Sequence, residues 1–209
     1  MQPSDLPVDM FQKHSAKLFH TTGITLAISQ SAHATASKAV ELAKQAGWLL
    51  SFDVNYRAKL WTPQGAREGC EAIMQQADIL FIPLRDAKLI YGYADDSSPE
   101  MVLGMLSQRF PKAVVVMTMS NQGSMAKDDS GVYSQGIFPA DEVGRLGGGD
   151  AFSAGFLYSY LQSREASLAL CYGAAVAALK YSITGDFPLV NKQEVETLVV
   201  QGAKTGLVR

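Results

Sequence analysis

Three consecutive glycines directly precede an aspartate in the stretch RLGGGDAFSAGF, which covers residues 145–156. Glycine loses much conformational entropy on folding, so a run of it is expected where the backbone takes a positive φ or lies against a ligand. If Gly147, Gly148 and Gly149 open a helix, their free backbone N–H groups and the helix dipole form an anion site beside Asp150. A flexible turn in which Asp150 caps the helix fits the same residues. These residues alone do not decide between a phosphate site and a capped turn.

A second group of polar residues follows an apolar run in the stretch SFDVNYRAKLW, residues 51–61. Asp53, Asn55 and Arg57 stand at alternate positions, so in extended backbone their side chains would point to one side. At the carboxyl end of a parallel strand, that side faces the crevice in which such sheets bind ligands. The Arg57 guanidinium suits a carboxylate, because its planar fork can donate two parallel hydrogen bonds. A solvated strand end is the alternative interpretation.

Strands and helices must position these two groups, and they alternate over the first 120 residues. Apolar, β-branched runs predict strands at residues 17–29, 48–54, 77–83 and 112–120. Helical spacing of apolar residues predicts helices between them, at residues 31–47, 62–77, 85–93 and 98–110. Such alternation is typical of βαβ units. It predicts an α/β fold with a mainly parallel sheet that is covered by helices on both faces.

The pattern changes after residue 120. Short polar and apolar runs predict a hairpin at residues 123–139, followed by helices at residues 150–162 and 166–182 and a last helix capped near Asn191. The helix over residues 166–182 is apolar on nearly all sides, which predicts that it is buried. No repeat and no long linker divides the chain, so residues 1–209 are predicted to form a single domain.

Composition excludes several classes of protein. The chain is 47% hydrophobic and 18% charged with a formal net charge of −2, which is typical of a soluble globular protein. This balance gives no electrostatic basis for binding nucleic acid or an anionic membrane. No apolar run reaches the length of a membrane span, and the first residues lack the pattern of a signal peptide. We therefore expect a cytoplasmic protein with neither nucleic acid nor membrane as a partner.

Cysteines and histidines give no metal-binding pattern. Cys70 and Cys171 lie far apart without metal-ligand spacing, and we expect free, buried thiols in a reducing compartment. The histidines, His14, His20 and His33, are scattered and are predicted to be surface or core residues rather than ligands.

Three stretches together resemble one protein family. RLGGGDAFSAGF resembles the second signature of the ribokinase/PfkB family of carbohydrate kinases, in which a glycine-rich turn precedes the catalytic aspartate. SFDVNYRAKLW looks like the corresponding stretch of that family's 2-keto-3-deoxygluconate kinases, with fructokinases close behind. Residues 177–198, AALKYSITGDFPLVNKQEVETL, resemble the C-terminal end of the same kinases. Order and spacing agree from about residue 15 to residue 200.

The resemblance implies a ribokinase-like three-layer α/β/α fold and ATP-dependent transfer of phosphate to a sugar hydroxyl. Asp150 would accept the hydroxyl proton, and the three preceding glycines would present backbone N–H groups to the migrating phosphoryl group. Asn55 would lie near the phosphates, while Arg57 and Asp53 would face the substrate. The expected substrate is 2-keto-3-deoxygluconate, since its carboxylate suits Arg57, and the expected product is the 6-phosphate. Fructose is the alternative substrate.

The resemblance also implies a nucleotide side and a metal. TMSNQGS, residues 118–124, resembles the family's nucleotide-side turn and keeps Thr118 and Gly123, with Ser120 in the place of the first glycine. Mg²⁺ is expected on the nucleotide phosphates, where it keeps most of its water and needs one or two carboxylates. Asp86 in PLRDA is the candidate that would hold a metal-bound water.

Two further positions depart from the family's pattern. Pro83 stands where the family's metal-side element has asparagine. Gly144 stands where the glycine-turn signature opens with an aspartate that is tied to a monovalent-cation site. The resemblance therefore gives no support for activation by a monovalent cation such as potassium.

Full-length members of that family begin with several further strands, which carry a di-glycine sugar-contact motif and a small β-sheet lid. None of these precedes Met1. We therefore expect the C-terminal, nucleotide-binding and catalytic portion of a PfkB-type kinase, as a truncated product or with a complementing N-terminal chain; a homo-oligomer is also compatible. A non-catalytic nucleotide-binding remnant, or half of a two-chain kinase, is the alternative function. A redox Rossmann enzyme or a serine hydrolase is not supported, because neither GxGxxG nor GxSxG occurs.

Overall fold

The computed structural model describes residues 1–13 and 16–205, which form two compact units. Unit 1 consists of Met1–Thr118 and Lys127–Ser130, and unit 2 consists of Met119–Ala126 and the chain from Gly131 onward. Each unit has its own strands and helices.

Unit 1 contains four strands and the helices that connect them. The strands are β1 (Leu18–Thr22), β2 (Leu49–Asp53), β3 (Ile79–Phe81) and β4 (Val114–Thr118). The helices between them are α2 (Gly23–Ala27), α3 (Gln30–Gln45), α4 (Pro63–Met74), α5 (Leu84–Tyr91) and α6 (Pro99–Arg109). A 3₁₀ turn, η1 (Pro3–Asp5), and a short helix, α1 (Val8–Lys13), precede them and were not expected from the sequence.

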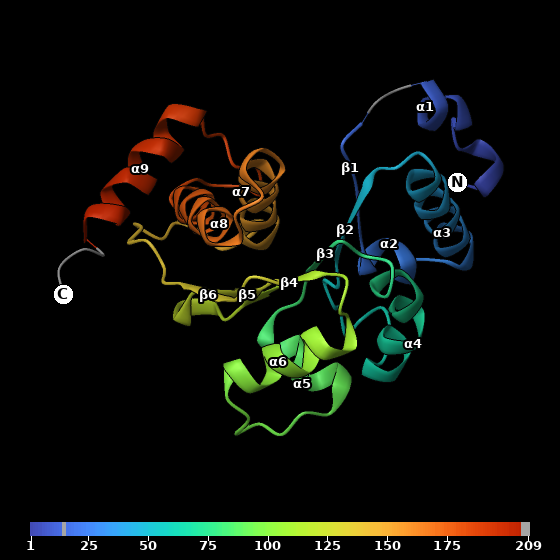
Figure 1. Cartoon of the computed structure of the whole chain (residues 1–209), viewed down its shortest axis with the longest axis horizontal. Helices are drawn as coiled ribbons and strands as arrows, with labels where there is room; N and C mark the ends of the chain where they lie inside the picture. Colours follow the sequence, from blue (N-terminus) through green and yellow to red (C-terminus); the bar gives the residue numbers. More distant parts are fainter. Residues whose placement is uncertain (14–15, 206–209) are drawn as a thin grey trace. The chain divides into compact units, whose positions relative to one another are not determined.

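The four strands of unit 1 pair in parallel and in chain order. β1 pairs with β2, β2 with β3, and β3 with β4, so that Asp53 lies opposite both Thr22 and Phe81. Because crossovers between parallel strands are right-handed, this order places the connecting helices on one face of the sheet, as Figure 1 shows. The α/β fold with a mainly parallel sheet is confirmed. The strands' carboxyl ends meet at one edge, where Asp53 ends β2.

The first predicted strand is too long. Strand β1 ends at Thr22, and Gly23 begins helix α2, so the expected strand over residues 17–29 is wrong in its second half. A Cβ atom on Gly23 would overlap the carbonyl oxygen of Val54, which shows how closely this helix start packs on the chain after β2. The residues that follow Gly23 are a short apolar run, and such a run fits strand and helix equally well until its packing is known.

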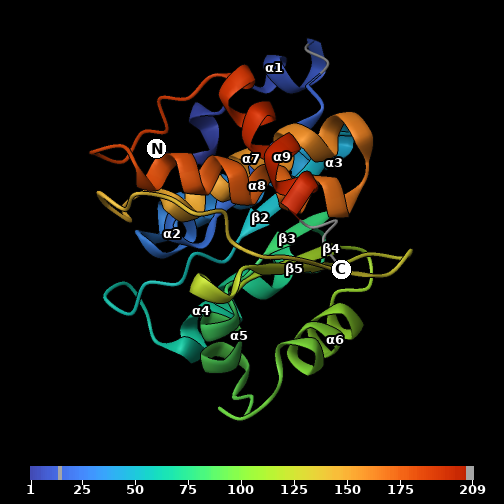
Figure 2. The ribbon, with the colours of Figure 1, turned by 90° about the vertical axis from the view of Figure 1, so that its left-hand side faces the viewer.

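Unit 2 contains the hairpin strands and three long helices. Its elements are η2 (Ser120–Gln122), β5 (Ser124–Lys127), β6 (Val132–Gln135), α7 (Gly148–Ser163), α8 (Ala166–Tyr181) and α9 (Lys192–Thr205). Helices α7 and α8 lie side by side, and α9 packs on α8 (Figures 1 and 2). The predicted cap of α9 is confirmed, because the Asn191 side chain accepts the Glu194 N–H at 3.0 Å.

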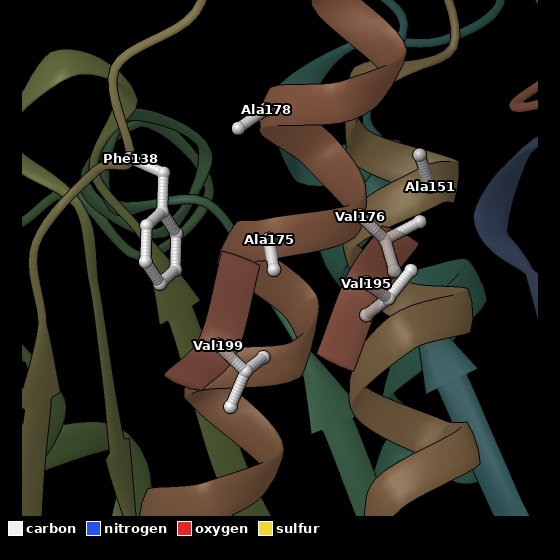
Figure 3. Packing of buried hydrophobic residues seen from close by; sticks show 7 residues of the cluster. All are labelled: Phe138, Ala151, Ala175, Val176, Ala178, Val195 and Val199. Atoms are coloured by element: carbon white, nitrogen blue, oxygen red, sulfur yellow. The ribbon is translucent and has the colours of Figure 1, made fainter. Parts of the chain in front are cut away.

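An apolar cluster holds these three helices together (Figure 3). It consists of Phe138, Ala151, Ala175, Val176, Ala178, Val195 and Val199, all of them buried. Small alanines on α7 and α8 allow the two helices to approach closely, and the valines of α9 fill the remaining space. The expectation that the helix over residues 166–182 is buried is confirmed for most of its length.

Cys70 and Cys171 are free thiols, as expected, but only Cys70 is buried and Cys171 is half-buried. Burial raises the pKa of both, that of Cys70 to about 12. Of the helices that the structure describes, none combines the length and the apolar character that a bilayer-spanning segment needs.

Candidate functional site

The glycine turn begins at Gly147, which occupies the N-cap position of helix α7. Its backbone is left-handed, with φ +78° and ψ 0°. A side chain is strained in this region of conformational space. A Cβ atom there would also overlap the carbonyl oxygen of Asp186, so both backbone geometry and packing require glycine at this position.

The next two glycines face different surroundings. Gly148 is buried, and a Cβ atom on it would overlap the ring of Tyr181. Gly149 is exposed, and a Cβ atom on it would have no neighbour within 4 Å. The first turn of α7 is therefore packed on one side and open on the other.

The open side presents unpaired backbone N–H groups. The Gly148 N–H donates to the Arg145 carbonyl at 3.2 Å, and the Ala151 N–H donates to the Gly147 carbonyl at 2.9 Å. Within the described residues, no hydrogen bond uses the N–H groups of Gly149 and Asp150. Unpaired N–H groups at the start of a 16-residue helix combine with the positive end of its dipole, which favours an anion.

Asp150 lies beside these N–H groups and is exposed. It is the third residue of α7, and Gly147 is the N-cap, so the interpretation of Asp150 as the cap is wrong. The following residue, Ala151, is buried in the apolar cluster of Figure 3 and anchors the turn. An exposed carboxylate on a fixed turn can accept a proton from a bound hydroxyl group.

Unit 1 holds the second group of predicted site residues. Asp53 is buried at the end of β2, and its Oδ1 accepts the Asn55 N–H at 3.0 Å. Asn55 has a left-handed backbone with φ +41°. The alternation expected for Asp53, Asn55 and Arg57 is therefore wrong, because the strand ends at Asp53 and the chain turns there.

The structure brings Asp86 to the same loop. Asp86 lies in the first turn of α5, and its carboxylate lies near the Tyr56 backbone N–H. Burial raises the pKa of Asp86, although the nearby positive charges of Arg85 and Arg57 and the Tyr56 N–H act in the opposite direction. Arg57 itself is exposed and donates to the Tyr56 carbonyl at 3.1 Å. Four of the predicted site residues thus lie in or beside one loop at the carboxyl edge of the sheet: Asp53, Asn55, Arg57 and Asp86.

The predicted nucleotide-side turn is also formed. Thr118 ends β4, and the Met119 N–H donates to the Gly123 carbonyl at 2.8 Å. Ser120, in the place of an expected glycine, has φ +55°, so this position requires a left-handed backbone and the serine adopts it. Gly123 has φ +87°, and a Cβ atom on it would overlap the carbonyl oxygen of Gln135.

Among the residues that the structure describes, no group of three or more histidine, cysteine, aspartate or glutamate residues could hold a metal ion. His20 pairs with Ser51 at 3.0 Å and His33 with the Gly69 carbonyl at 3.1 Å, while His14 lies outside the described residues. Asp86 offers one carboxylate, which matches the modest demand of a nucleotide-bound Mg²⁺.

Sequence reasoning missed the residues that support the glycine turn. The Tyr181 carbonyl accepts the N–H groups of Val143 and Gly144 at 2.8 Å and 3.2 Å. These hydrogen bonds join backbone atoms, so the residue types do not reveal them. The sequence offered one signal near Tyr181, because its neighbour Lys180 is the only charged residue of helix α8.

Known proteins are similar to this chain in sequence and in fold. The sequence profile of the pfkB family carbohydrate kinases matches residues 4–188. The 2-dehydro-3-deoxygalactonokinase of Haloferax volcanii is 36% identical over 208 residues, which cover 100% of this chain and 64% of that enzyme. The structure of 2-dehydro-3-deoxygluconokinase from Thermotoga maritima has a TM-score of 0.85 at 23% identity, with 96% of this chain and 64% of that chain covered.

A further solved structure is similar in fold. It is a protein of Escherichia coli assigned as a ribokinase II, in complex with ATP and Mg²⁺, with a TM-score of 0.82 at 22% identity. The similarity covers 96% of this chain and 63% of the Escherichia coli protein. The chain thus spans somewhat less than two thirds of the length of each of these proteins.

Proposed function

The chain belongs to the pfkB family of carbohydrate kinases, and from this premise we propose that it performs ATP-dependent phosphoryl transfer to a 2-keto-3-deoxy sugar acid. The similarity to a 2-dehydro-3-deoxygalactonokinase supports this substrate class. The proposed substrate is 2-keto-3-deoxygluconate, which would be phosphorylated on its 6-hydroxyl. Its galactonate epimer is the first competitor, because the two sugar acids differ only in the configuration of one carbon.

The open first turn of helix α7 is the observation that carries the proposal. The N–H groups of Gly149 and Asp150 have no partner among the described residues, and they would donate to the oxygens of the transferred phosphoryl group. Gly147 and Gly148 would fix that turn through their packing on the other side. Phosphoryl transfer depends chiefly on positioning and on charge stabilisation, which a fixed turn of N–H dipoles supplies.

The proposed reaction forms one bond, breaks one bond and moves one proton. The oxygen of the sugar hydroxyl forms a bond to the γ-phosphorus, and the bond between that phosphorus and the bridging oxygen of ADP breaks. The hydroxyl proton passes to the carboxylate of Asp150, which is exposed beside the open turn. The products are the sugar phosphate and ADP.

The substrate's carboxylate is proposed to bind Arg57. The guanidinium is exposed on the loop after β2, and only one of its N–H groups is used by the Tyr56 carbonyl within the described residues. Asp53 and Asn55 form the turn that presents it. Fructose lacks a carboxylate, so Arg57 would favour the keto acid over fructose.

The proposed cofactors are ATP and Mg²⁺. When bound, Mg²⁺ supplies charge neutralisation on the phosphates. Asp86 would hold one of its waters, and the turn that includes Thr118 and Gly123 would contact the nucleotide through backbone groups. The proposal does not include a monovalent cation, since Gly144 offers no side-chain ligand in the glycine turn.

The test is a phosphorylation assay with ATP and Mg²⁺ on 2-keto-3-deoxygluconate, its galactonate epimer, fructose and ribose. We expect turnover of a keto acid above that of the neutral sugars, and loss of turnover in Asp150→Asn. Preference for fructose would overturn the substrate class. ATP binding measured by calorimetry separates a kinase that lacks turnover from a chain that does not bind nucleotide.

The alternative proposal is a nucleotide-binding function without turnover, as a remnant of a kinase or as one half of a two-chain kinase. Binding of ATP without turnover, and recovery of turnover when the N-terminal third of a relative is added as a separate chain, would favour the second of these. Turnover by the chain alone excludes both.

A further inference from the structure

Lys180 is a buried charge that the proposed reaction does not use. Its side chain has 0% exposure in the last turn of helix α8. The ammonium Nζ donates to the carbonyl oxygen of Ile183 at 3.0 Å, just after the helix ends. Within the described residues, no carboxylate forms an ion pair with it. Lys180 is therefore a fully buried side chain whose ammonium binds a backbone carbonyl group.

A buried ammonium is unfavourable unless its surroundings compensate it. The end of a helix provides such compensation, because its last carbonyl groups lack intrahelical partners and its dipole is negative there. A methionine at position 180 would pack as well as the apolar stem of the lysine does. The amine's specific contribution is the link it makes from α8 to Ile183, which fixes how the chain leaves the helix.

The chain that leaves α8 is the support of the glycine turn. The Tyr181 carbonyl accepts the N–H groups of Val143 and Gly144. The Tyr181 ring lies against Gly148, and the Asp186 carbonyl lies against Gly147. Residues 181–186, which we call the brace, thus contact the turn through backbone hydrogen bonds and through two close packing contacts. The Lys180–Ile183 bond lies at the start of the brace.

We propose that Lys180 is a positioning residue, whose buried ammonium holds the brace in the conformation that supports the glycine turn. The consequence for nucleotide binding rests on the proposed function, while the consequence for the turn itself does not. Loss of the ammonium should loosen residues 143–150 first, because their support comes from the segment that Lys180 fixes.

Hydrogen exchange of the backbone N–H groups tests this without any ligand. In Lys180→Met, the hydrogen-bonded N–H groups of Val143, Gly144, Gly148 and Ala151 should exchange faster by about tenfold or more, as expected when a hydrogen bond from a charged donor is lost. The matched control is Lys192→Met, which removes an exposed lysine of the same unit that pairs with Glu196. Exchange in the control should equal that of the wild type. A folded Lys180→Met chain with wild-type exchange over these residues overturns the proposal.

A wild-type measurement decides the matter if Lys180→Met does not fold. The Lys180 ammonium protons should give a nitrogen-correlated NMR signal that is protected from solvent exchange, unlike those of exposed lysines. Protons that exchange as rapidly as those of Lys192 would overturn the proposal. ATP–Mg²⁺ titration of the variants is the third readout, with affinity expected to fall about tenfold in Lys180→Met and to recover in Lys180→Arg, which keeps a charged donor. If the wild type binds no ATP, the proposed function fails while the exchange and NMR results still decide the role of Lys180.

Discussion

The aromatic ring of Tyr181 lies so close to the α-carbon of Gly148 that a methyl group on this glycine would overlap the ring. Its neighbour Gly149 faces open space. The three glycines before Asp150 are therefore not a uniformly flexible run. One is required by its left-handed backbone, one by the ring of Tyr181, and one leaves the ligand side of the turn open.

This difference predicts opposite effects for two similar substitutions. Gly148→Ala should lower the free energy of unfolding by about 1–3 kcal/mol, because the added methyl group overpacks the contact with Tyr181. Gly149→Ala should leave stability unchanged or raise it by up to about 1 kcal/mol, since alanine favours the helix and meets no neighbour. Urea unfolding of the two variants measures both effects. Equal destabilisation would contradict the packing described for Gly148.

Asp150→Asn should reduce phosphoryl transfer by about 10²–10⁴-fold, because the amide cannot accept the hydroxyl proton. Its stability should change little, since the side chain is exposed and its interaction with the helix dipole is worth only about 0.3–1 kcal/mol. Steady-state rates and a thermal melt measure the two quantities. Asp141→Asn, which changes an exposed acid of the same unit, is the control and should keep wild-type rates. An Asp150→Asn chain with wild-type turnover would remove Asp150 from the reaction.

Arg57→Lys should raise the KM for the keto acid by about 10–100-fold, because a lysine keeps the charge and loses the planar fork. The KM for fructose should not change, since fructose has no carboxylate to bind. Arg85→Lys is the matched control, as it alters an exposed arginine beside the same Asp86. An equal effect of Arg57→Lys on both substrates would show that Arg57 shapes the loop rather than reading the carboxylate.

The buried thiol of Cys70 predicts a pH dependence of stability. Burial, aided by the charge of Glu71, raises its pKa from 9.0 to about 12. Below pH 9 the thiol is protonated in both states and its contribution to stability is complete. Between pH 9 and pH 12 the unfolded thiol ionises while the native one does not. The free energy of unfolding should therefore fall by up to about 1.4 kcal/mol per pH unit.

Urea unfolding of the wild type and Cys70→Ala at several pH values measures this slope. The variant should be less stable at neutral pH because of the cavity it leaves, and it should lose less stability as the pH rises. The raised pKa of Tyr91 acts in the same direction in both chains, so the difference between their slopes isolates Cys70. Parallel curves would show that Cys70 titrates alike in the folded and unfolded states.

Local chemistry predicted most of the fold. Thr62 before Pro63 marks the start of α4, and the Thr62 hydroxyl accepts the Gly65 N–H at 3.1 Å as a cap should. Asn191 marks the start of α9 for the same reason. The failure at Gly23 has a different origin, since the close packing of Gly23 on Val54 joins residues 31 positions apart. Local patterns carry no information on such contacts.

In the candidate site, too, local features were predictable from the sequence and long-range contacts were not. The glycine turn before Asp150 was predicted because its residue types are unusual within a short stretch. The association of Asp86 with the loop of Arg57 depends on the pairing of neighbouring strands, and it became visible only in the folded chain. Lys180 was overlooked because a helix that is apolar on nearly all sides is interpreted by its apolar residues, although its one charge is the feature that requires explanation.

The brace has a consequence for how this chain can change over evolution or by gene shuffling. Residues 143–148 and residues 181–186 touch each other, yet two whole helices separate them along the chain. A recombinant with its crossover inside α7 or α8 would take the turn from one parent and its support from the other. The fit of the Tyr181 ring against Gly148 is then the contact that both parents must supply.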